Sequence, residues 1–341
     1  MNCQVRARSP LRLSFSGGGT DVPPFPEREG GAVLSATINR HAYASVTPRA
    51  DGEIHVRSLD YGTTLSYRPE DKLIYDGKLD LVKAAIINMN GEQPSGLDIF
   101  LHTDLPPGTG LGSSSAMMVA LVGALGLMKG VSLTDYEIAD LAYRLERVEL
   151  SISGGLQDQY ASTFGGFNFI EFFKDSVVVT PLRIPSDVLN ELEYNLLLVY
   201  TGGTRLSAGI IDDQVERYER SEEDSVVALR EIKRLTIEMK NELLKCQLRK
   251  FAEHLHEEWQ AKRQLSPKIS NHFIDEVYEE ARKAGAIGGK LLGAGGGGYM
   301  LLYCESEQKH CVAERLEQMG CVPTDFDFTH EGLETWRVNN G

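Results

Sequence analysis

A glycine- and serine-rich segment between a strand-like and a helix-like stretch constrains this chain more than any other feature. The segment, residues 106–116, is PPGTGLGSSSA. Residues 97–102 before it alternate apolar and polar as in a half-buried strand, and the dense apolar run 116–128 after it is typical of a buried helix. Its glycines let the backbone turn sharply with amides pointing inward, and its serines lie at the positive end of the helix dipole. The segment predicts an anion-binding loop; a flexible loop with a serine helix cap is the plainer alternative.

The composition indicates a globular chain and disfavours two classes of partner. The chain has 341 residues, 42% apolar and 25% charged, which is enough for two domains of typical size. Its formal net charge is −14 at pH 7. A chain this acidic has no broad positive field to attract nucleic acid or an anionic membrane surface. A nucleotide remains compatible with this charge, because local amides and a few cations can hold so small an anion.

Cysteine usage and the N-terminus predict a cytoplasmic protein. The five cysteines are scattered without a CxxC pair, so neither a zinc site nor a redox dithiol is indicated. Arg6, Arg8 and Arg12 are not followed by the continuous apolar core that a signal peptide needs. The longest apolar run, residues 116–128, falls short of the roughly 20 residues of a membrane span.

Two further glycine-rich segments carry weaker signals. Residues 9–21 run from a strand-like stretch through a glycine turn to Asp21, which on its own is more typical of a turn or cap residue. Residues 293–298 contain the dinucleotide fingerprint GxGxxG, but a strand-like stretch follows where that fingerprint needs a helix. We therefore reject a Rossmann site. Near-unbroken glycine predicts instead a close approach of this backbone to a ligand or another segment, or a tight turn.

Helical signals elsewhere are clear but carry little chemistry. Thr134 and Glu137 have the spacing of a capping box. After Glu222, charged sequence with leucine and isoleucine at helical spacing predicts two amphipathic helices, which we interpret as solvated and without catalytic role. Residues 274–284, 299–304 and 308–319 predict a helix, a strand and a helix.

Taken together, the three motifs in this order resemble those of the GHMP kinases, a family that includes galactokinase, homoserine kinase and mevalonate kinase. The phosphate loop of the family, Pro-x-x-x-Gly-Leu-Gly-Ser-Ser-Ala, is matched from Pro107 to Ala116 with one extra serine. Residues 10–21 and 293–298 match the first and third motifs. Within the family, residues 9–21 and 154–160 look most like the kinases of D-glycero-D-manno-heptose 7-phosphate that serve bacterial surface polysaccharide synthesis.

The resemblance implies an α+β fold of two domains with the active site in the cleft between them. The N-terminal domain, residues 1–185, would resemble ribosomal protein S5 domain 2, and the C-terminal domain, residues 186–341, would be ferredoxin-like. Pro181 and Pro185 mark the boundary. The implied cofactors are ATP and Mg²⁺. The implied partner is a small-molecule sugar phosphate, with neither nucleic acid nor membrane, and a homo-oligomer stays open.

The same resemblance assigns the contacts with ATP and metal. Ser114 and Glu146 match the metal ligands, although the extra serine leaves Ser113 open in place of Ser114. Helical phase alone favours Glu149, which falls at the centre of the apolar face, but we follow the resemblance and choose Glu146. The residues expected to bind ATP are Pro107, Gly108, Gly110, Leu111, Gly112, Ser113, Ser114 and Ser115.

For catalysis, the resemblance matches Asp158 with the base of the family; without it, Asp158 would be a loop residue making an Asx turn. Arg12 matches the cationic position of the first motif, where it would hold Asp158 and stabilise charge on the moving phosphoryl group. Arg205 could bind the 7-phosphate with two hydrogen bonds, or equally be a surface arginine. The other expected substrate contacts are Thr20, Asp21, Gly295 and Gly296.

The expected reaction is transfer of the γ-phosphoryl of ATP to the anomeric hydroxyl of the heptose 7-phosphate, giving the 1,7-bisphosphate. Two alternatives stay open. One is an L-fucokinase-like enzyme that acts on an unphosphorylated sugar, and the other is a non-catalytic sensor of sugar and ATP with the same fold. Against the sensor, Glu146, Asp158 and the serine loop are all present.

Overall fold

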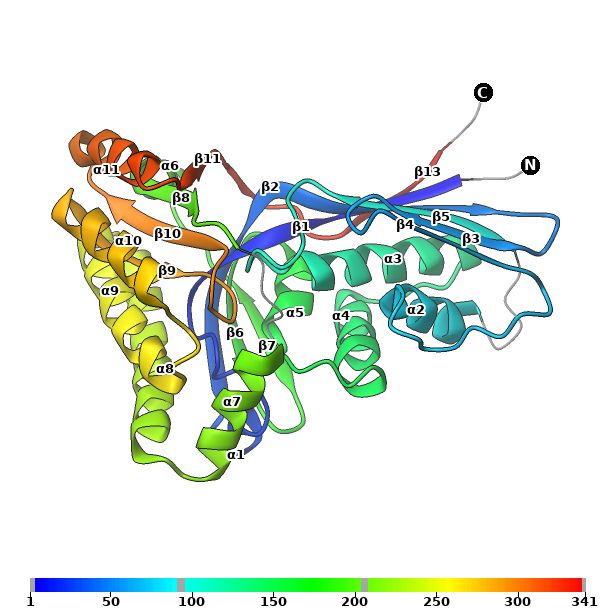
Figure 1. Ribbon diagram of the computed structural model, residues 1–341, viewed down its shortest axis with the longest axis horizontal. Helices are drawn as coiled ribbons and strands as arrows, with labels where there is room; N and C mark the ends of the chain where they lie inside the picture. The colour runs from blue at the N-terminus through cyan, green and yellow to red at the C-terminus, as the bar shows by residue number, and fades with distance from the viewer. Residues whose placement is uncertain (1–3, 91–95, 204–207, 339–341) are drawn as a thin grey trace.

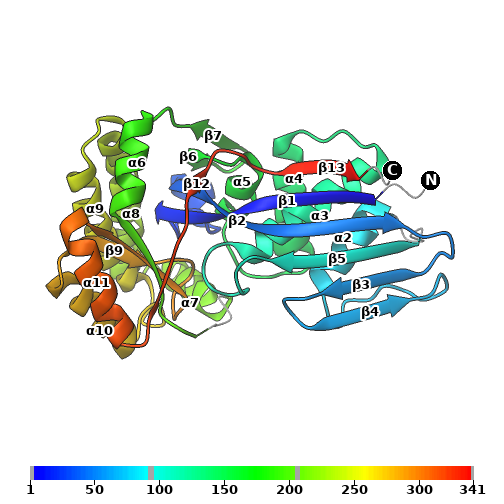
Figure 2. The same cartoon turned by 90° about the horizontal axis from the view of Figure 1, so that it is seen from above.

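Two long paired strands join the two lobes of the structure, a computed structural model that describes residues 4–90, 96–203 and 208–338 (Figure 1). These strands are β1 (Gln4–Ser16) and β2 (Gly31–Pro48), which pair antiparallel. The second half of β2 pairs with β5 (Leu97–Thr103), and its first half pairs with β6 (Phe167–Phe172). A single continuous strand therefore runs from the far end of the larger sheet to the region beside the second lobe (Figure 2).

The larger sheet has nine strands among the described residues. Its main path has the order β13-β1-β2-β5-β3-β4, while β6 and β12 pair with β2, and β7 pairs with β6. Only β3 and β5 pair in parallel; the other pairs are antiparallel. The remaining strands of this sheet are β3 (Ile54–Ser58), β4 (Thr63–Tyr67), β7 (Val177–Pro181), β12 (Phe328–Thr329) and β13 (Glu334–Val338).

Helices of the first half cover one face of this sheet (Figure 1). As its apolar sequence predicts, α3 (Ser113–Lys129) is buried along most of its length and packs against β1 and β2. The expected capping box opens α4 (Asp135–Tyr143), where the Thr134 hydroxyl accepts from the Glu137 amide and the Glu137 carboxylate accepts from the Thr134 amide. The other helices here are α2 (Asp80–Asn90), the π-helical turn η1 (Arg144–Glu149) and α5 (Gln157–Phe164), whereas α1 (Phe25–Glu29) packs with the second lobe through Phe25.

A smaller antiparallel sheet with its own helices forms the second lobe. Its strand order among the described residues is β11-β8-β10-β9, with β8 at Leu196–Tyr200, β9 at Ala286–Leu291, β10 at Tyr299–Cys304 and β11 at Val322–Thr324. The two amphipathic helices expected after Glu222 are confirmed as α8 (Glu223–Leu244) and α9 (Leu248–Leu265), and α9 packs on β9. The predicted final helix, strand and helix are also confirmed. The other helices are α6 (Ser186–Asn195), α7 (Ala208–Glu219), α10 (His272–Lys283) and α11 (Ser306–Gln318).

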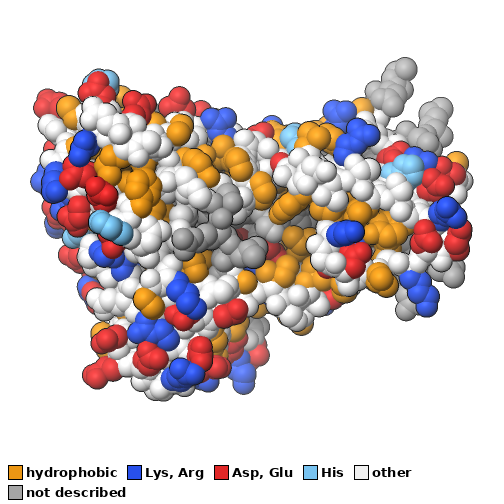
Figure 3. All heavy atoms as spheres, in the orientation of Figure 1, with side chains coloured by type: hydrophobic (Ala, Val, Ile, Leu, Met, Phe, Trp, Pro, Cys, Tyr) orange, Lys and Arg blue, Asp and Glu red, His pale blue; other side chains and the backbone are white. Residues whose placement is uncertain are grey.

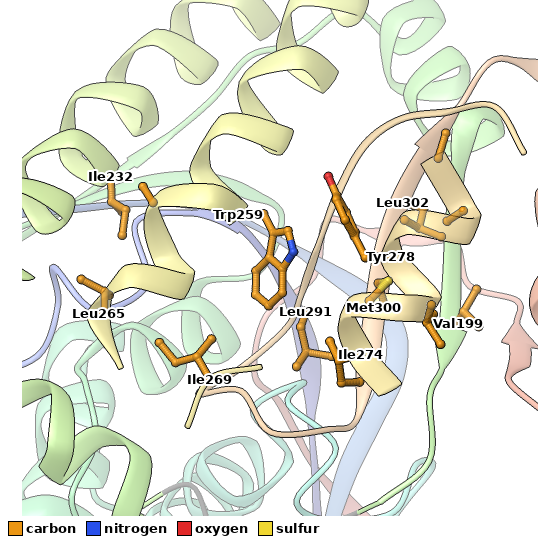
Figure 4. Packing of buried hydrophobic residues seen from close by; sticks show 14 of the residues in the cluster. Val199, Ile232, Trp259, Leu265, Ile269, Ile274, Tyr278, Leu291, Met300 and Leu302 are labelled. Atoms are coloured by element: carbon orange, nitrogen blue, oxygen red, sulfur yellow. The ribbon is translucent and has the colours of Figure 1, made fainter. Parts of the chain in front are cut away.

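The apolar core of the second lobe forms around the face of α9 that points inward. Trp259 is fully buried, and Figure 4 shows its ring among other buried side chains, including Ile269 from the segment between α9 and α10, Tyr278 of α10 and Leu291 of β9. Burying a large aromatic side chain contributes roughly 1.5–3 kcal/mol from transfer alone. This packing holds α9 firmly against the sheet, which matters because the same helix borders the cavity described below.

The end of the described chain returns to the first sheet. β12 pairs with β2, and β13 pairs with β1, with an ion pair between Arg8 and Glu334 across the second pair. Residues 328–338 therefore lie on the sheet of the first lobe. The proposed domain boundary lies between residues 185 and 186. Strands β12 and β13 follow this boundary in the sequence but belong to the sheet of the first lobe.

Charged side chains are interspersed over the lobe that carries α8 to α11 (Figure 3). Several form ion pairs on these helices, such as Arg234 with Glu231 and Glu238 on α8. The outward faces of these helices are solvated, as their sequence predicts. Among the helices that the structure describes, none is long and apolar enough to cross a membrane.

Gly288→Ala should destabilise the protein, because β9 runs against the backbone of α9 at this point. A Cβ atom added at Gly288 would overlap the carbonyl oxygen of Ala252 on α9, and backbone cannot move aside as a flexible side chain can. Overpacking of this kind costs about 1–3 kcal/mol. Thermal and urea unfolding measure the change. Gly209→Ala is the matched control, since its added Cβ meets nothing within 4 Å and should leave stability unchanged or slightly higher.

Candidate active site

A cavity of about 290 Å³ lies where the three glycine-rich segments meet. It is bordered by the loop before α3, by residues 18–21 after β1, by the start of α5 and by residues 292–297 before β10. The structure thus brings together segments that are far apart in the sequence. Of the predicted site residues, those that line the cavity are Arg12, Asp21, Gly108, Gly110, Gly112, Ser113, Ser114, Ser115, Glu146, Asp158 and Gly295.

Four of the predicted site residues do not line the cavity. Thr20 is fully buried, and its hydroxyl donates to the backbone carbonyls of Gly17 and Ala32, so the geometry does not support the expected contact with substrate. Leu111 is also fully buried and packs in the apolar core. Pro107 and Gly296 are absent from the lining as well, and the amide of Gly296 donates to the carbonyl of Ile269. Arg205 lies outside the described residues.

The loop before α3 has the backbone conformation of an anion cradle. Gly108, Gly110 and Gly112 all have positive φ, at 76°, 88° and 75°, which only glycine adopts without strain. Gly112 directly precedes the first residue of α3, Ser113. The unpaired amides and the positive dipole end of this buried helix therefore face the cavity.

The late glycine tract packs on this loop backbone to backbone. The carbonyl of Thr109 accepts a hydrogen bond from the amide of Tyr299 at 3.0 Å. A Cβ atom at Gly293 would come within 2.6 Å of the Cα of Gly110. The predicted close approach is confirmed, and the partner is another chain segment. A strand, β10, follows the tract, which also confirms the rejection of a Rossmann site.

An ion pair ties the start of α5 to β1 and to the loop. Asp158 accepts a hydrogen bond at Oδ1 from Nε of Arg12 at 2.8 Å, and Nη2 of the same guanidinium lies 2.6 Å from that oxygen in an ion pair. The third guanidinium nitrogen, Nη1, donates to the carbonyl of Gly110 at 2.7 Å. The Arg12 side chain is 4% exposed and that of Asp158 is 18% exposed. Asp158 therefore presents a fixed carboxylate to the cavity with Oδ2 left for a ligand.

Asp21 lies beside this pair and is held by three donors. Its carboxylate accepts from the amide of Gly19 at 3.0 Å, and from the amide and the side chain of Gln157 at 3.1 Å each. Burial raises the pKa of Asp21, and the negative charge of Asp158 adds to the rise, against the hydrogen bonds from the backbone. A carboxylate so arranged is placed to receive hydroxyl groups of a ligand.

Glu146 faces the serines of the loop, and Glu149 does not. The Glu146 carboxylate accepts hydrogen bonds from Ser114 Oγ at 3.2 Å, from Ser115 Oγ at 2.7 Å and from Gln159 Nε2 at 2.6 Å. Glu149 is exposed on the other side, where it accepts from Asn88. The preference from helical phase for Glu149 was wrong, because residues 144–149 form a π-helical turn. The wider turn shifts every following residue around the helix axis.

The same family is recognised in both halves of the chain. Residues 80–166 match the model of the GHMP kinases N-terminal domain, and residues 239–320 match that of the GHMP kinases C-terminal domain. The D-glycero-alpha-D-manno-heptose 7-phosphate kinase of Campylobacter jejuni is 36% identical over 98% of this chain and 99% of its own length. The chain belongs to the GHMP kinase family. It is a phosphotransferase with an alcohol group as acceptor.

Two other similarities bear on this GHMP kinase. The crystal structure of a D-glycero-D-manno-heptose 1-phosphate kinase from Bacteroides thetaiotaomicron superposes with a TM-score of 0.83 and 33% identity, over 98% of this chain and 100% of that one. The mixed α+β GHMP kinase fold expected from the sequence is thereby confirmed. The bifunctional fucokinase/GDP-fucose pyrophosphorylase of Arabidopsis thaliana is 27% identical over 92% of this chain but only 31% of its own length.

GHMP kinases use ATP, typically with Mg²⁺, and the residues around Glu146 fit such a metal. Glu146 is 2% exposed, and the hydroxyl of Ser114 lies next to its carboxylate, while Ser113 makes no such contact. Carboxylate and hydroxyl oxygens are hard ligands suited to Mg²⁺, which otherwise keeps water and phosphate oxygens. Among the described residues no group of three His, Cys, Asp or Glu could hold a metal alone. Ser114 and Glu146 would therefore share it with the phosphates of the nucleotide.

Several residues of the cavity wall were missed from the sequence, Lys262 among them. Lys262 lies on α9, a helix to which the sequence assigned no chemistry, yet its side chain lines the cavity. A signal was present, because Glu258 and Lys262 fall at helical spacing on the same face as the buried Leu255 and Leu265. Charged residues within an apolar stripe are seldom buried without a partner or a function.

Glu146→Gln should raise the Mg²⁺ concentration needed for half-maximal turnover by about 10-fold or more, the scale found when groups that support a metal site are lost. The neutral amide offers a weaker oxygen ligand and no negative charge. Titration of activity with MgCl₂ at fixed ATP measures the shift. Glu149→Gln, three residues further along the same π-helical segment, is the matched control. An equal shift in both variants would contradict the assignment of Glu146.

Proposed function

We propose that this GHMP kinase transfers the γ-phosphoryl of ATP to the anomeric hydroxyl of a D-glycero-D-manno-heptose 7-phosphate, giving the 1,7-bisphosphate used as a precursor of bacterial surface polysaccharide. The similarity to the Campylobacter jejuni enzyme, over nearly the full length of both chains, supports this substrate. The Arg12–Asp158 pair is the single observation that supports the chemistry, because it places a fixed carboxylate beside the phosphate-binding loop.

In the proposed mechanism the chain mainly positions its two substrates and neutralises charge. The amides of residues 108–112 and the N-terminus of α3 bind the phosphates of the nucleotide. When bound near Ser114 and Glu146, Mg²⁺ supplies positive charge to the phosphate oxygens. Asp21 orients hydroxyl groups of the sugar.

Asp158 then takes the proton of the acceptor hydroxyl at Oδ2, the oxygen that Arg12 leaves unused. Arg12 holds the carboxylate by a hydrogen bond and a close ion pair to the same oxygen, and keeps a positive charge next to the loop. Its third bond, to the carbonyl of Gly110, fixes the distance between the base and the phosphate-binding backbone. A base held in this way contributes through orientation as well as through proton transfer.

A second candidate is an L-fucokinase-like enzyme that phosphorylates the anomeric hydroxyl of an unphosphorylated sugar. The likeness to the fucokinase of Arabidopsis thaliana favours it, although identity is lower. A non-catalytic sensor is disfavoured, since Asp158 and Glu146 are both held in the cavity with oxygens facing it.

Substrate choice is tested by measuring ATP consumption with a panel of heptoses and hexoses, each with and without a distal phosphate. We expect kcat/KM for heptose 7-phosphate to exceed that for the free heptose by about tenfold to more than a hundredfold, the range that one charge-assisted contact provides. Product analysis should place the new phosphate at the anomeric carbon. Equal use of free and phosphorylated sugars would favour the fucokinase-like alternative.

Asp158→Asn should lower kcat by about 10²–10⁴-fold, the contribution of a positioned base. Binding of ATP, measured by calorimetry, should be nearly unchanged, because the nucleotide contacts the loop and not this carboxylate. Asp175→Asn, at an exposed position between β6 and β7, is the matched control and should turn over at the wild-type rate. An Asp158→Asn enzyme that keeps more than about a tenth of the wild-type kcat would show that Asp158 is not the base.

A further inference from the structure

Lys262 has an unusual position among the cations of the cavity. It projects from α9, and the whole residue is 4% exposed. Its Nζ donates one hydrogen bond, to the carbonyl of Gly293 at 2.6 Å. An ammonium group has three donors, so in the part of the chain that the structure describes two of them remain for a ligand.

The other two cations that line the cavity are already paired with carboxylates. Arg12 pairs with Asp158. Arg147 lies 3.6 Å from Glu146 and also donates to the carbonyls of Ile152 and Ser153. No carboxylate oxygen of the described residues lies within 4.0 Å of Lys262, whose polar contact is a neutral carbonyl. Lys262 is therefore the cavity cation without a carboxylate partner among the described residues, whereas Arg147, whose Nε also lacks a hydrogen-bond partner, is paired with Glu146.

The charges packed around Lys262 explain why it stays unpaired. On its own helix, Glu258 is bonded at 2.6 Å to Lys290 of β9, and both side chains are almost wholly buried. Lys262 also faces the positive Arg12 of β1 and the carboxylate of Asp21 in the turn after β1. Three other donors already hold that carboxylate. Burial, followed by the charge of Lys290, lowers the pKa of Lys262 to about 7. The protein offers this cation no full counter-charge of its own.

The surroundings leave space for a ligand next to this group. Gly18 has no side chain to cover Nζ, and a Cβ atom there would lie 3.8 Å from Nζ and 3.6 Å from Gln157 Nε2. Gln157 is the residue before Asp158, and both residues line the same cavity. The recess beside Lys262 is therefore continuous with the proposed base. The carbonyl oxygen of the Gln157 side chain is buried without a hydrogen-bond partner among the described residues. An anion in this recess would meet the ammonium group, and a hydroxyl group of the same ligand could donate to the Gln157 side-chain oxygen.

We propose that Lys262 binds the distal phosphate of the sugar phosphate substrate and so selects phosphorylated over free sugars. This inference rests on the proposed function and gives Lys262 the part that the sequence suggested for Arg205. A phosphomonoester carries between one and two negative charges near neutral pH. Bound next to Nζ, it supplies the counter-charge that the protein lacks and accepts the unused N–H donors. Binding also favours the protonated lysine, because an adjacent negative charge stabilises the cation.

Lys262→Met tests this with heptose 7-phosphate and free heptose as paired substrates. We expect kcat/KM for the phosphorylated sugar to fall about tenfold to more than a hundredfold, while kcat/KM for free heptose and the KM for ATP stay within about twofold. Lys250→Met, exposed on the same helix, is the matched control and should behave as wild type. The melting temperature of Lys262→Met should equal or exceed that of wild type, since a desolvated cation is replaced by an apolar side chain.

Each other outcome has a definite meaning. If wild type prefers heptose 7-phosphate and Lys262→Met keeps that preference, the role of Lys262 is wrong and the proposed function stands. If the variant loses activity equally with both sugars, Lys262 acts on the transferred phosphoryl group or on the structure, and the proposal also fails. If wild type shows no preference for the phosphorylated sugar, the proposed function fails and the role of Lys262 fails with it.

The wild-type pH profile tests the same proposal without a variant. The protonated lysine is the binding form, and its fraction falls as pH rises through about 7. The profile of kcat/KM reports groups of the free enzyme, so kcat/KM for heptose 7-phosphate should decline above about pH 7. Lys262→Met should lack this decline, and free heptose should not show it in either enzyme. A flat wild-type profile between pH 7 and 9 would contradict the proposal.

Discussion

The ion pair between Arg12 and Asp158 joins the three segments that make the cavity. Arg12 belongs to β1, Asp158 to the start of α5, and the third bond of the guanidinium reaches Gly110 in the loop before α3. All three positions depend on a sheet that brings β1 beside α3 and α5. Because the pair is largely buried, losing one partner would leave the other charge uncompensated, a cost well above that of a surface ion pair. Structure and proposed chemistry therefore depend on the same contact.

The glycine tract borders the cavity and also supports it by backbone packing. Gly293 and Gly298 are pressed against residues 109 and 110, where any Cβ atom would overlap the backbone. This contact holds the loop before α3 against the second lobe. Lys262 of α9 donates a hydrogen bond to the carbonyl of Gly293 in the tract. Mobility of a phosphate-binding loop would weaken its pre-organised amides. The tract thus couples α9, the loop and the smaller sheet into one support.

Local rules predicted much of this molecule from the sequence, and the exceptions have identifiable causes. The strand, loop and helix around residues 97–129, the capping box at Thr134 and the amphipathic helices α8 and α9 follow from short-range patterns. Helical phase favoured Glu149 over Glu146, because a pattern with a period of 3.6 residues does not reveal a π-helical turn. The likeness to a family supplied Arg12 and Asp158 as a pair, since their side chains are 146 residues apart. Lys262 was missed because the charged positions of α9 were interpreted as a solvated face, although Glu258 and Lys262 lie in the apolar stripe of this helix.

The contrast between the charge of the whole chain and that of the cavity follows from screening. The net charge is −14, whereas in the cavity lining the three cations Arg12, Arg147 and Lys262 offset the three carboxylates Asp21, Glu146 and Asp158, and the N-termini of α3 and α5 add positive potential. Many acidic side chains lie on exposed helix faces, where water and salt reduce their influence beyond about 8 Å. Buried cations and helix ends act over a few ångströms in a medium of lower effective dielectric constant, so they set the local potential. An acidic protein can therefore border a cavity suited to phosphate groups, because a few buried cations and helix ends act on that cavity at short range.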